Sequence, residues 1–169
     1  MAQPAEIAPL IMQAYNLTKR EGEVTQAVLH EVFDALHRNR VALEHMLLKP
    51  SMVVAGKEQA RQAPVVEVAA QTVSVLRRCV PAAVPGIFFL SGGQTPPEAS
   101  AHLDAINRLG PQPWALSFSY GRALQDPVLH AWKGQAANVR SAQDALLERA
   151  RLNSAAREGR YDSAMEVKG

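Results

Sequence analysis

Leu43-Glu44-His45-Met46-Leu47-Leu48-Lys49-Pro50-Ser51-Met52-Val53 gives the first indication of how this chain folds. A short apolar run ends there at Lys49. Pro50 keeps the run from continuing as a helix, because the residue before a proline is pushed toward extended backbone geometry. The pattern therefore predicts a buried strand whose last residue carries an amine.

Lys49 is the first candidate functional residue. In barrels and doubly wound sheets, chemistry takes place at the C-terminal ends of parallel strands. A lysine that is desolvated there has a lowered pKa, and its neutral amine can attack a carbonyl carbon to form a Schiff base. The alternative is that Lys49 only marks the point at which the strand emerges into water.

Helical patterns flank this strand along the chain. Thr18 and Glu21 have the spacing of a capping box, as do Thr95 and Glu98, where Pro96 suits the first helical turn. An apolar stripe at helical spacing follows the first box and consists of Val24, Val28, Leu29, Val32, Phe33 and Leu36. The predicted helices cover about residues 18–39, 64–78, 95–106, 126–132 and 135–158.

Two further apolar runs predict strands, at residues 86–90 and 114–119. The first run is almost continuous, which is typical of a strand covered on both faces. Strands that alternate with helices indicate an α/β protein with about three parallel strands and flanking helices. Lys49, Ser91 and Arg122 would then lie at the C-terminal ends of successive strands, on one rim of the sheet.

Ser91-Gly92-Gly93 lies between a predicted strand and a well-capped helix. Glycines let backbone amides approach an anion closely, a serine hydroxyl adds a donor, and a helix N-terminus adds positive potential. The segment therefore has the features of a phosphate site. The alternative is that the two glycines only make a tight turn between strand and helix.

Gly121-Arg122 repeats this arrangement after the next predicted strand. It offers an exposed backbone amide and a guanidinium that can bind phosphate with two hydrogen bonds. Arg122 could equally be a solvated surface arginine. In (βα)8 barrels, however, the loops after the last two strands usually form the phosphate site.

Composition narrows the class of protein. Hydrophobic residues make up 47% of the 169 residues and charged residues 20%, which is ordinary for a globular domain, and a net charge of +2 without a polybasic tract argues against nucleic-acid or membrane partners. Cys79 is the single cysteine, and no segment resembles a leader or a membrane span, so we expect a cytoplasmic protein. His30 and His37 lack companions that would complete a metal site, so no metal is expected.

Three segments together resemble one known family. They are Leu47-Leu48-Lys49-Pro50-Ser51-Met52-Val53, Phe89-Leu90-Ser91-Gly92-Gly93-Gln94 and Trp114-Ala115-Leu116-Ser117-Phe118-Ser119-Tyr120-Gly121-Arg122-Ala123-Leu124-Gln125. From about Val24 to Tyr161 the chain resembles the C-terminal half of a class I fructose-bisphosphate aldolase. The resemblance implies a partial (βα)8 TIM barrel over residues 18–161, an irregular segment at 1–17 and a tail at 162–169.

The resemblance also implies a reaction, which is the cleavage of fructose 1,6-bisphosphate to dihydroxyacetone phosphate and glyceraldehyde 3-phosphate. Lys49 would be the Schiff-base lysine that captures dihydroxyacetone phosphate, and Ser91, Gly92, Gly121 and Arg122 would hold its phosphate. The family is a lyase of glycolysis that needs no metal or other cofactor, and it forms homotetramers.

Some positions depart from the family pattern. The family's glutamate-proline-glutamate segment, which transfers protons, is matched only by Gln3-Pro4-Ala5-Glu6, its glycine near the lysine is replaced by His45, and its other acid/base residues belong to earlier strands. Cleavage of a carbon-carbon bond needs such groups. The rival hypothesis is therefore an inactive, truncated paralogue that binds sugar phosphates or other aldolase subunits; transaldolase-like Schiff-base chemistry is a third.

Three parallel strands leave two open sheet edges. Unpaired edge strands pair readily with other chains. We therefore expect a homo-oligomer or pairing with a complementary half-barrel.

Overall fold

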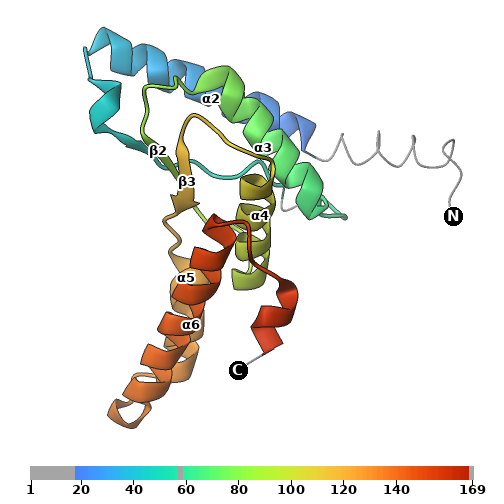
Figure 1. The fold of residues 1–169 in the computed structure, drawn as a ribbon, viewed down its shortest axis with the longest axis vertical. Coiled ribbons are helices and arrows are strands. Elements are labelled where there is room, and N and C mark those ends of the chain that lie inside the picture. Colours follow the sequence, from blue (N-terminus) through green and yellow to red (C-terminus); the bar gives the residue numbers. More distant parts are fainter. Residues whose placement is uncertain (1–17, 57–58, 168–169) are drawn as a thin grey trace, which may run out of the picture.

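The computed structural model describes residues 18–56 and 59–167. Its three parallel strands are β1 (Leu47–Leu48), β2 (Gly86–Phe89) and β3 (Ala115–Phe118), in the order β1-β2-β3 (Figure 1). This parallel sheet with helices between its strands confirms the predicted α/β class. The predicted irregular segment 1–17 and the Gln3-Pro4-Ala5-Glu6 segment lie outside the described residues.

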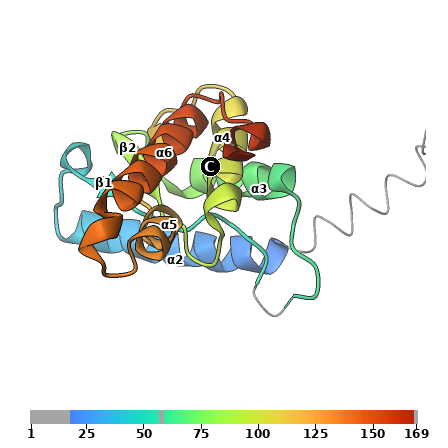
Figure 2. The same ribbon diagram turned by 90° about the horizontal axis from the view of Figure 1, so that it is seen from below.

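Within the described residues, the α-helices are α2 (Lys19–Arg38), α3 (Val65–Cys79), α4 (Pro96–Arg108), α5 (Arg122–Trp132) and α6 (Val139–Arg157). α3 connects β1 to β2 and α4 connects β2 to β3, as crossovers between parallel strands require. α5 and α6 pack against each other as a hairpin that projects away from the sheet (Figures 1 and 2).

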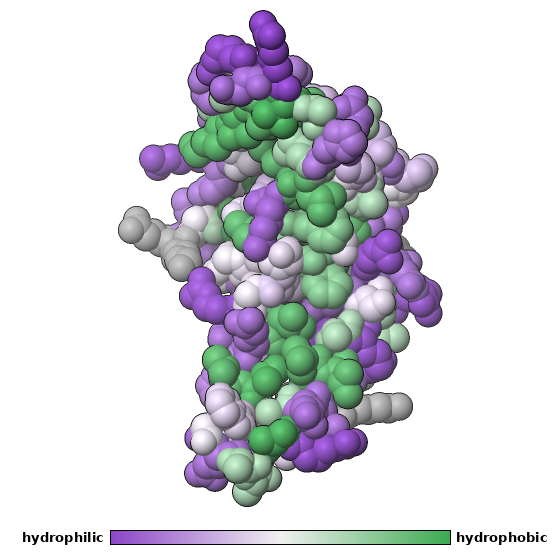
Figure 3. All heavy atoms as spheres, turned by 90° about the vertical axis from the view of Figure 1, so that its left-hand side faces the viewer, coloured by the Kyte–Doolittle hydropathy of each residue, from purple (hydrophilic) through white to green (hydrophobic). Residues whose placement is uncertain are grey.

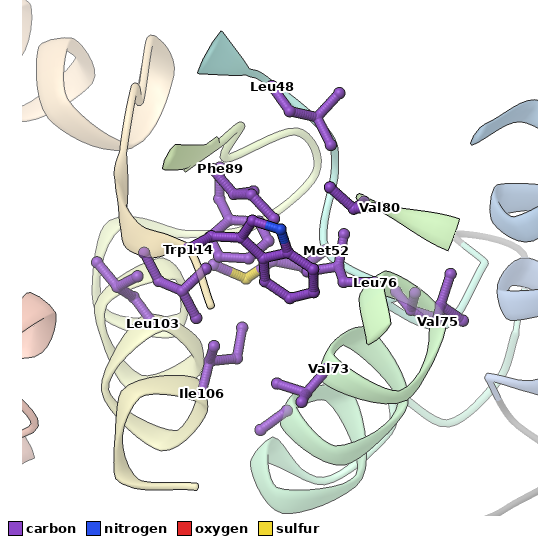
Figure 4. Close-up of a cluster of buried hydrophobic side chains, with 14 of the residues drawn as sticks. Leu48, Met52, Val73, Val75, Leu76, Val80, Phe89, Leu103, Ile106 and Trp114 are labelled. Carbon is purple, nitrogen blue, oxygen red and sulfur yellow. The ribbon is translucent and has the colours of Figure 1, made fainter. Parts of the chain in front are cut away.

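The register of the strands gives the sheet two unlike faces. Leu48, Ile87 and Leu116 are neighbours on one face, and all three are buried. Side chains of α3 and α4 fill the space beside this face (Figure 4), where the buried cluster includes Val73, Leu76, Leu103, Ile106, Phe89 and Trp114. Leu47 lies on the opposite face and exposes 58% of its surface. One face is therefore core and the other is largely uncovered.

The prediction of a buried strand that ends at Lys49 is wrong in the length of the strand and in its burial. Leu43–His45 form a 3₁₀ helix, and only Leu47 and Leu48 pair with β2. β1 lies at the edge of the described sheet, so no described strand pairs with its free side. His45 is exposed in the 3₁₀ helix and does not share an inward strand face with Lys49.

The predicted capping box at the start of α2 is also wrong. Thr18 precedes the helix, but its Oγ1 donates to Glu67 Oε1 in α3 at 2.6 Å. Glu21 Oε1 accepts from the amide of Gly56 at 3.1 Å. Both side chains therefore tie other segments to the start of α2.

Only part of the predicted apolar stripe on α2 is buried. Leu29 and Phe33 lie in the core, whereas Val24, Val28 and Val32 are exposed. α3 is the helix that packs on α2, and it covers one side only. The valine side of α2 is left without cover by the described residues.

The C-terminal segment folds back onto α4 and α6. Arg149 of α6 is buried and its guanidinium donates to both carboxylate oxygens of Glu166, at 2.8 and 2.6 Å, and to Ser100 Oγ at 2.7 Å. Ser100 Oγ in turn donates to Asn153 Oδ1 at 2.6 Å. The described part of the predicted tail is thus held in place, with residues 163–167 forming a 3₁₀ helix.

Apolar side chains also reach the surface. Figure 3 shows them gathered on the side of the molecule that lies to the left in Figure 1. The exposed large apolar residues of the sheet edge and of the α5–α6 hairpin are Leu47, Leu129, Trp132, Val139, Leu146 and Leu147. No helix within residues 18–56 and 59–167 has the length and apolar character needed to cross a bilayer.

Candidate functional site

The C-terminal ends of the three strands meet at one rim, as predicted. Beyond the strands, the amide of Leu90 donates to the carbonyl of Pro50 at 2.9 Å, and the amide of Ser119 donates to the carbonyl of Phe89 at 2.9 Å. These bonds continue the parallel pairing past the ends of the strands. They bring the loops that follow β1, β2 and β3 next to one another.

Ser91 joins two of these loops. Its side chain is buried, and its Oγ accepts a hydrogen bond from the amide of Ala123 at 3.3 Å, in the first turn of α5. The bond places the loop after β2 beside Gly121 and Arg122. The structure therefore brings together the four predicted phosphate ligands, although the Ser91 oxygen already serves as an acceptor.

The glycines of the rim leave backbone open. Gly93 has a positive φ of 79° in the turn that the amide of Gln94 closes onto the carbonyl of Ser91, a conformation that favours glycine. A Cβ at Gly92 or Gly121 would meet no atom within 4 Å. Packing within the described chain therefore leaves room for a side chain at positions 92 and 121. A ligand that approaches the backbone closely at these positions would need glycine there.

The two helix N-termini at the rim differ. α4 begins with the predicted capping box, because Thr95 N donates to Glu98 Oε2 at 2.8 Å and Glu98 N donates to Thr95 Oγ1 at 3.4 Å. Its positive end is thus already matched by a carboxylate. α5 begins after Gly121, which has no side chain to cap it, and its first turn contains no acidic residue; Ser91 Oγ accepts from the amide of Ala123, while the amides before it stay open. Its N-terminus is the one that remains open to an anion.

Unpaired donors gather at the start of α5. Among the described residues, the amides of Gly92, Gly121 and Arg122 have no hydrogen-bond partner, and the exposed Arg122 guanidinium has no ion-pair partner. The helix was predicted to begin at about Asp126, and its earlier start is what places Arg122 here. Pro127 lies inside the helix rather than at its beginning.

A hollow of about 1340 Å³ adjoins this cluster of donors. The starts of α2, α4 and α5 and the loop after β1 line it, and its lining includes Arg20, Glu21, Ser51, Gly92, Gly93, Gln94, Glu98, His102, Arg122 and Asp126. Arginines and backbone amides on its wall suit an anionic group. Nowhere in the described part of the chain do three or more histidine, cysteine or acidic side chains gather as a metal site would require.

Lys49 follows β1 at the same rim but does not line the hollow. Pleat alternation from Leu47 directs Lys49 to the uncovered face of the sheet, and its side chain is exposed. The predicted desolvation of this amine is therefore wrong for the described chain. The cause is the open face, since no described segment packs over it.

His102 and Gln94 form a contact that the sequence did not indicate. His102 lies on α4 with 7% of its surface exposed, and its Nδ1 is 2.7 Å from Gln94 Oε1. Burial lowers the pKa of this histidine, and Glu98 opposes that shift. Gln94 precedes α4 and His102 lies eight residues further on, so helical spacing did not indicate this contact.

Other aromatic and thiol side chains serve packing. Trp114 is buried and its Nε1 donates to the carbonyl of Pro81 at 2.9 Å. Cys79 is a buried free thiol. Trp132, by contrast, has 42% of its surface exposed on the α5–α6 hairpin.

Comparison with known proteins identifies relatives along the chain. Fructose-bisphosphate aldolase of Plasmodium falciparum (isolate 3D7) is 55% identical over 138 residues, which are 82% of this chain and 37% of that protein. The aldolase of Dictyostelium discoideum is 47% identical over 152 residues, or 90% of this chain and 43% of that protein. Fructose-bisphosphate aldolase 1, chloroplastic, of Chlamydomonas reinhardtii is 49% identical over 173 residues, which cover 99% of this chain and 46% of that protein.

A solved structure is similar as well. It is a fructose-bisphosphate aldolase from Plasmodium falciparum in complex with TRAP and a small-molecule inhibitor, with a TM-score of 0.84 and 52% identity over 86% of this chain and 42% of that chain. The chain thus spans less than half the length of these relatives. The family model described as glycolytic fructose-bisphosphate aldolase class-I matches residues 7–169. Over nearly its whole length, then, this chain belongs to the class I fructose-bisphosphate aldolase family.

Proposed function

We propose that this chain provides the ketone-binding half of a class I fructose-bisphosphate aldolase site. Lys49 is the nucleophile, and Ser91, Gly92, Gly121 and Arg122 hold the phosphate of dihydroxyacetone phosphate. The observation that carries the proposal is the set of unpaired donors at the start of α5, on the same rim as Lys49. An anion bound there would be held by the open backbone amides, the guanidinium of Arg122 and the positive end of α5.

The chemistry that these residues can support is formation of a Schiff base. The neutral amine of Lys49 attacks the C2 carbonyl of the ketone, and the carbinolamine that forms loses water to give a protonated imine. The phosphate contacts hold the ketone for this attack. Cleavage of the carbon-carbon bond in fructose 1,6-bisphosphate needs proton transfers in addition, and Lys49 does not line the hollow in which Glu98, His102 and Asp126 lie.

The rest of the barrel would supply what cleavage needs. The chain spans 37–46% of the length of these relatives, and a further strand would pair along the open β1 edge, beside the uncovered sheet face. We propose that a complementary half-barrel or another copy of the chain covers this face and desolvates Lys49. The alternative function is binding of sugar phosphates or aldolase subunits without turnover, which the exposure of Lys49 favours.

A cytoplasmic location belongs to the same proposal. The single, free and buried thiol of Cys79 fits a reducing compartment. Fractionation of source cells, with the chain found in the soluble cytoplasmic fraction, is the expected result. Recovery from an organelle would contradict it.

Borohydride trapping tests the central proposal. Incubation with dihydroxyacetone phosphate and borohydride should reduce the imine to a stable secondary amine, which intact mass and peptide mapping would place on Lys49. Lys49→Ala should abolish the adduct, and Arg122→Ala should require a higher ketone phosphate concentration for the same extent of labelling. Lys133→Ala is the control, since Lys133 ends α5 far along the helix from the rim. A folded chain that gives no adduct would leave binding without catalysis as its function.

A further inference from the structure

The loop from Ser91 to Gln94 carries the open amides of the proposed phosphate site, and it is anchored at both ends. Ser91 Oγ fixes the first end to the amide of Ala123. At the other end, the amide of Gln94 closes the turn onto Ser91, and the Gln94 side chain lies 2.7 Å from Nδ1 of His102. Between the anchors stand Gly92 and Gly93, which are both exposed.

We propose that His102 is the positioning residue of this phosphate loop: its imidazole holds the Gln94 side chain and so fixes the direction of the Gly92 and Gly93 amides. The inference rests on the proposed function, because it assigns a role at the same site. Two consecutive glycines have wide conformational freedom, so an unanchored loop would lose entropy when it binds a phosphate. The contact with His102 removes that freedom before the ligand arrives.

The surroundings of His102 support this role. Burial lowers the pKa of the imidazole and so favours the neutral ring, whose Nδ1-protonated tautomer donates to Gln94 Oε1. Glu98 stands one turn earlier on α4, while Arg122 and Asp126 of α5 and Arg20 and Glu21 of α2 line the same hollow. None of these groups forms a hydrogen bond to the ring among the described residues. The contact with Gln94 is the polar bond that the buried ring makes there.

Two substitutions of His102 distinguish the effect of its hydrogen bond to Gln94 from the effect of its side-chain volume. His102→Leu keeps an apolar side chain of similar size and removes the donor. His102→Asn keeps a donor, because the Asn amide nitrogen can occupy the place of Nδ1. His30→Leu is the matched control, since His30 is exposed on α2.

Two ketones and inorganic phosphate serve as probes on the whole chain. The Leu variant should need about tenfold more dihydroxyacetone phosphate for half-maximal trapping on Lys49, the loss expected for one buried hydrogen bond. Trapping with dihydroxyacetone, which lacks the phosphate, should stay unchanged. Phosphate binding, followed by NMR titration, should weaken to the same extent, and His102→Asn and His30→Leu should behave like the parent chain.

The outcomes are distinct. Three results would overturn the positioning role. The first is that His102→Leu weakens trapping of both ketones equally, and the second is that His102→Asn weakens trapping as much as His102→Leu does. The third is that His102→Leu binds phosphate as tightly as the parent chain. A parent chain that binds no phosphate would overturn it as well. If the parent gives no adduct on Lys49 but binds phosphate, and the Leu variant binds it about tenfold more weakly, the proposed catalysis fails while the positioning role stands.

Discussion

The imidazole of His102 links the ionisation of one residue to the stability of the rim. Burial lowers its pKa from the ordinary value of 6.5, with Glu98 acting in the opposite direction. Between the folded and unfolded pKa values the unfolded chain binds more protons, so the stability contribution of the neutral ring is present above pH 6.5 and is lost as pH falls below it. We expect the parent chain to lose more unfolding free energy than His102→Asn between pH 7.5 and pH 5.5.

Urea unfolding at the two pH values measures this difference. Carboxylates that titrate in the same range affect both proteins alike, so subtraction isolates the histidine. An equal loss of stability in the two proteins would show that burial does not perturb His102.

At the scale of elements, the two predicted capping boxes differ: the one at Thr95 forms from neighbouring residues, whereas the side chains of the one at Thr18 bond to other segments. The Thr95 box forms within four residues of sequence at the start of α4, with both of its hydrogen bonds present. Thr95→Ala should lower the free energy of unfolding by about 1 kcal/mol, as loss of a helix cap does. Chemical denaturation monitored by circular dichroism measures the change.

Thr25→Ala is the control for this element. Thr25 lies inside α2, where its hydroxyl donates to the carbonyl of Glu21 at 2.7 Å without capping the helix. A hydrogen bond from a threonine hydroxyl to the carbonyl four residues earlier does not stabilise a helix, and alanine has a higher helix propensity than threonine. Thr25→Ala should therefore change the free energy of unfolding by less than about 0.5 kcal/mol. Equal costs at Thr25 and Thr95 would mean that the box does not stabilise α4.

For the whole molecule, the uncovered face determines behaviour in solution. β1 is an edge strand of the sheet, and its residue Leu47 is exposed on the uncovered face. We expect the chain to self-associate with rising concentration in sedimentation velocity, and Leu47→Lys to shift the distribution toward the monomer, because a charged edge strand resists pairing. Val66→Lys replaces an exposed valine of α3, away from the edge, and should leave the distribution unchanged.

The complementary half of a class I aldolase provides the second part of this experiment. Added to the chain, it should replace self-association with a one-to-one complex if it covers the same face. A parent chain that stays monomeric at every concentration, or two lysine variants with the same effect, would contradict the assignment of the open edge as the contact.

Features that depend on neighbours along the chain could be predicted from the sequence. Apolar runs and flanking prolines located β2 and β3, the Thr95 box located the start of α4, and the order of strands and helices placed Lys49, Ser91 and Arg122 on one rim. Strand propensity, turn chemistry and helix capping act over a few residues, so local pattern was sufficient to predict them.

The contacts between residues that are distant in sequence could not be predicted in this way. Thr18 bonds Glu67 rather than capping α2, and Lys49 stays exposed because no described segment covers its face. The contact between Gln94 and His102 likewise depends on how the loop after β2 lies against α4. Burial and long-range hydrogen bonds are set by packing in three dimensions, and local periodicity in a sequence does not specify which surfaces will meet.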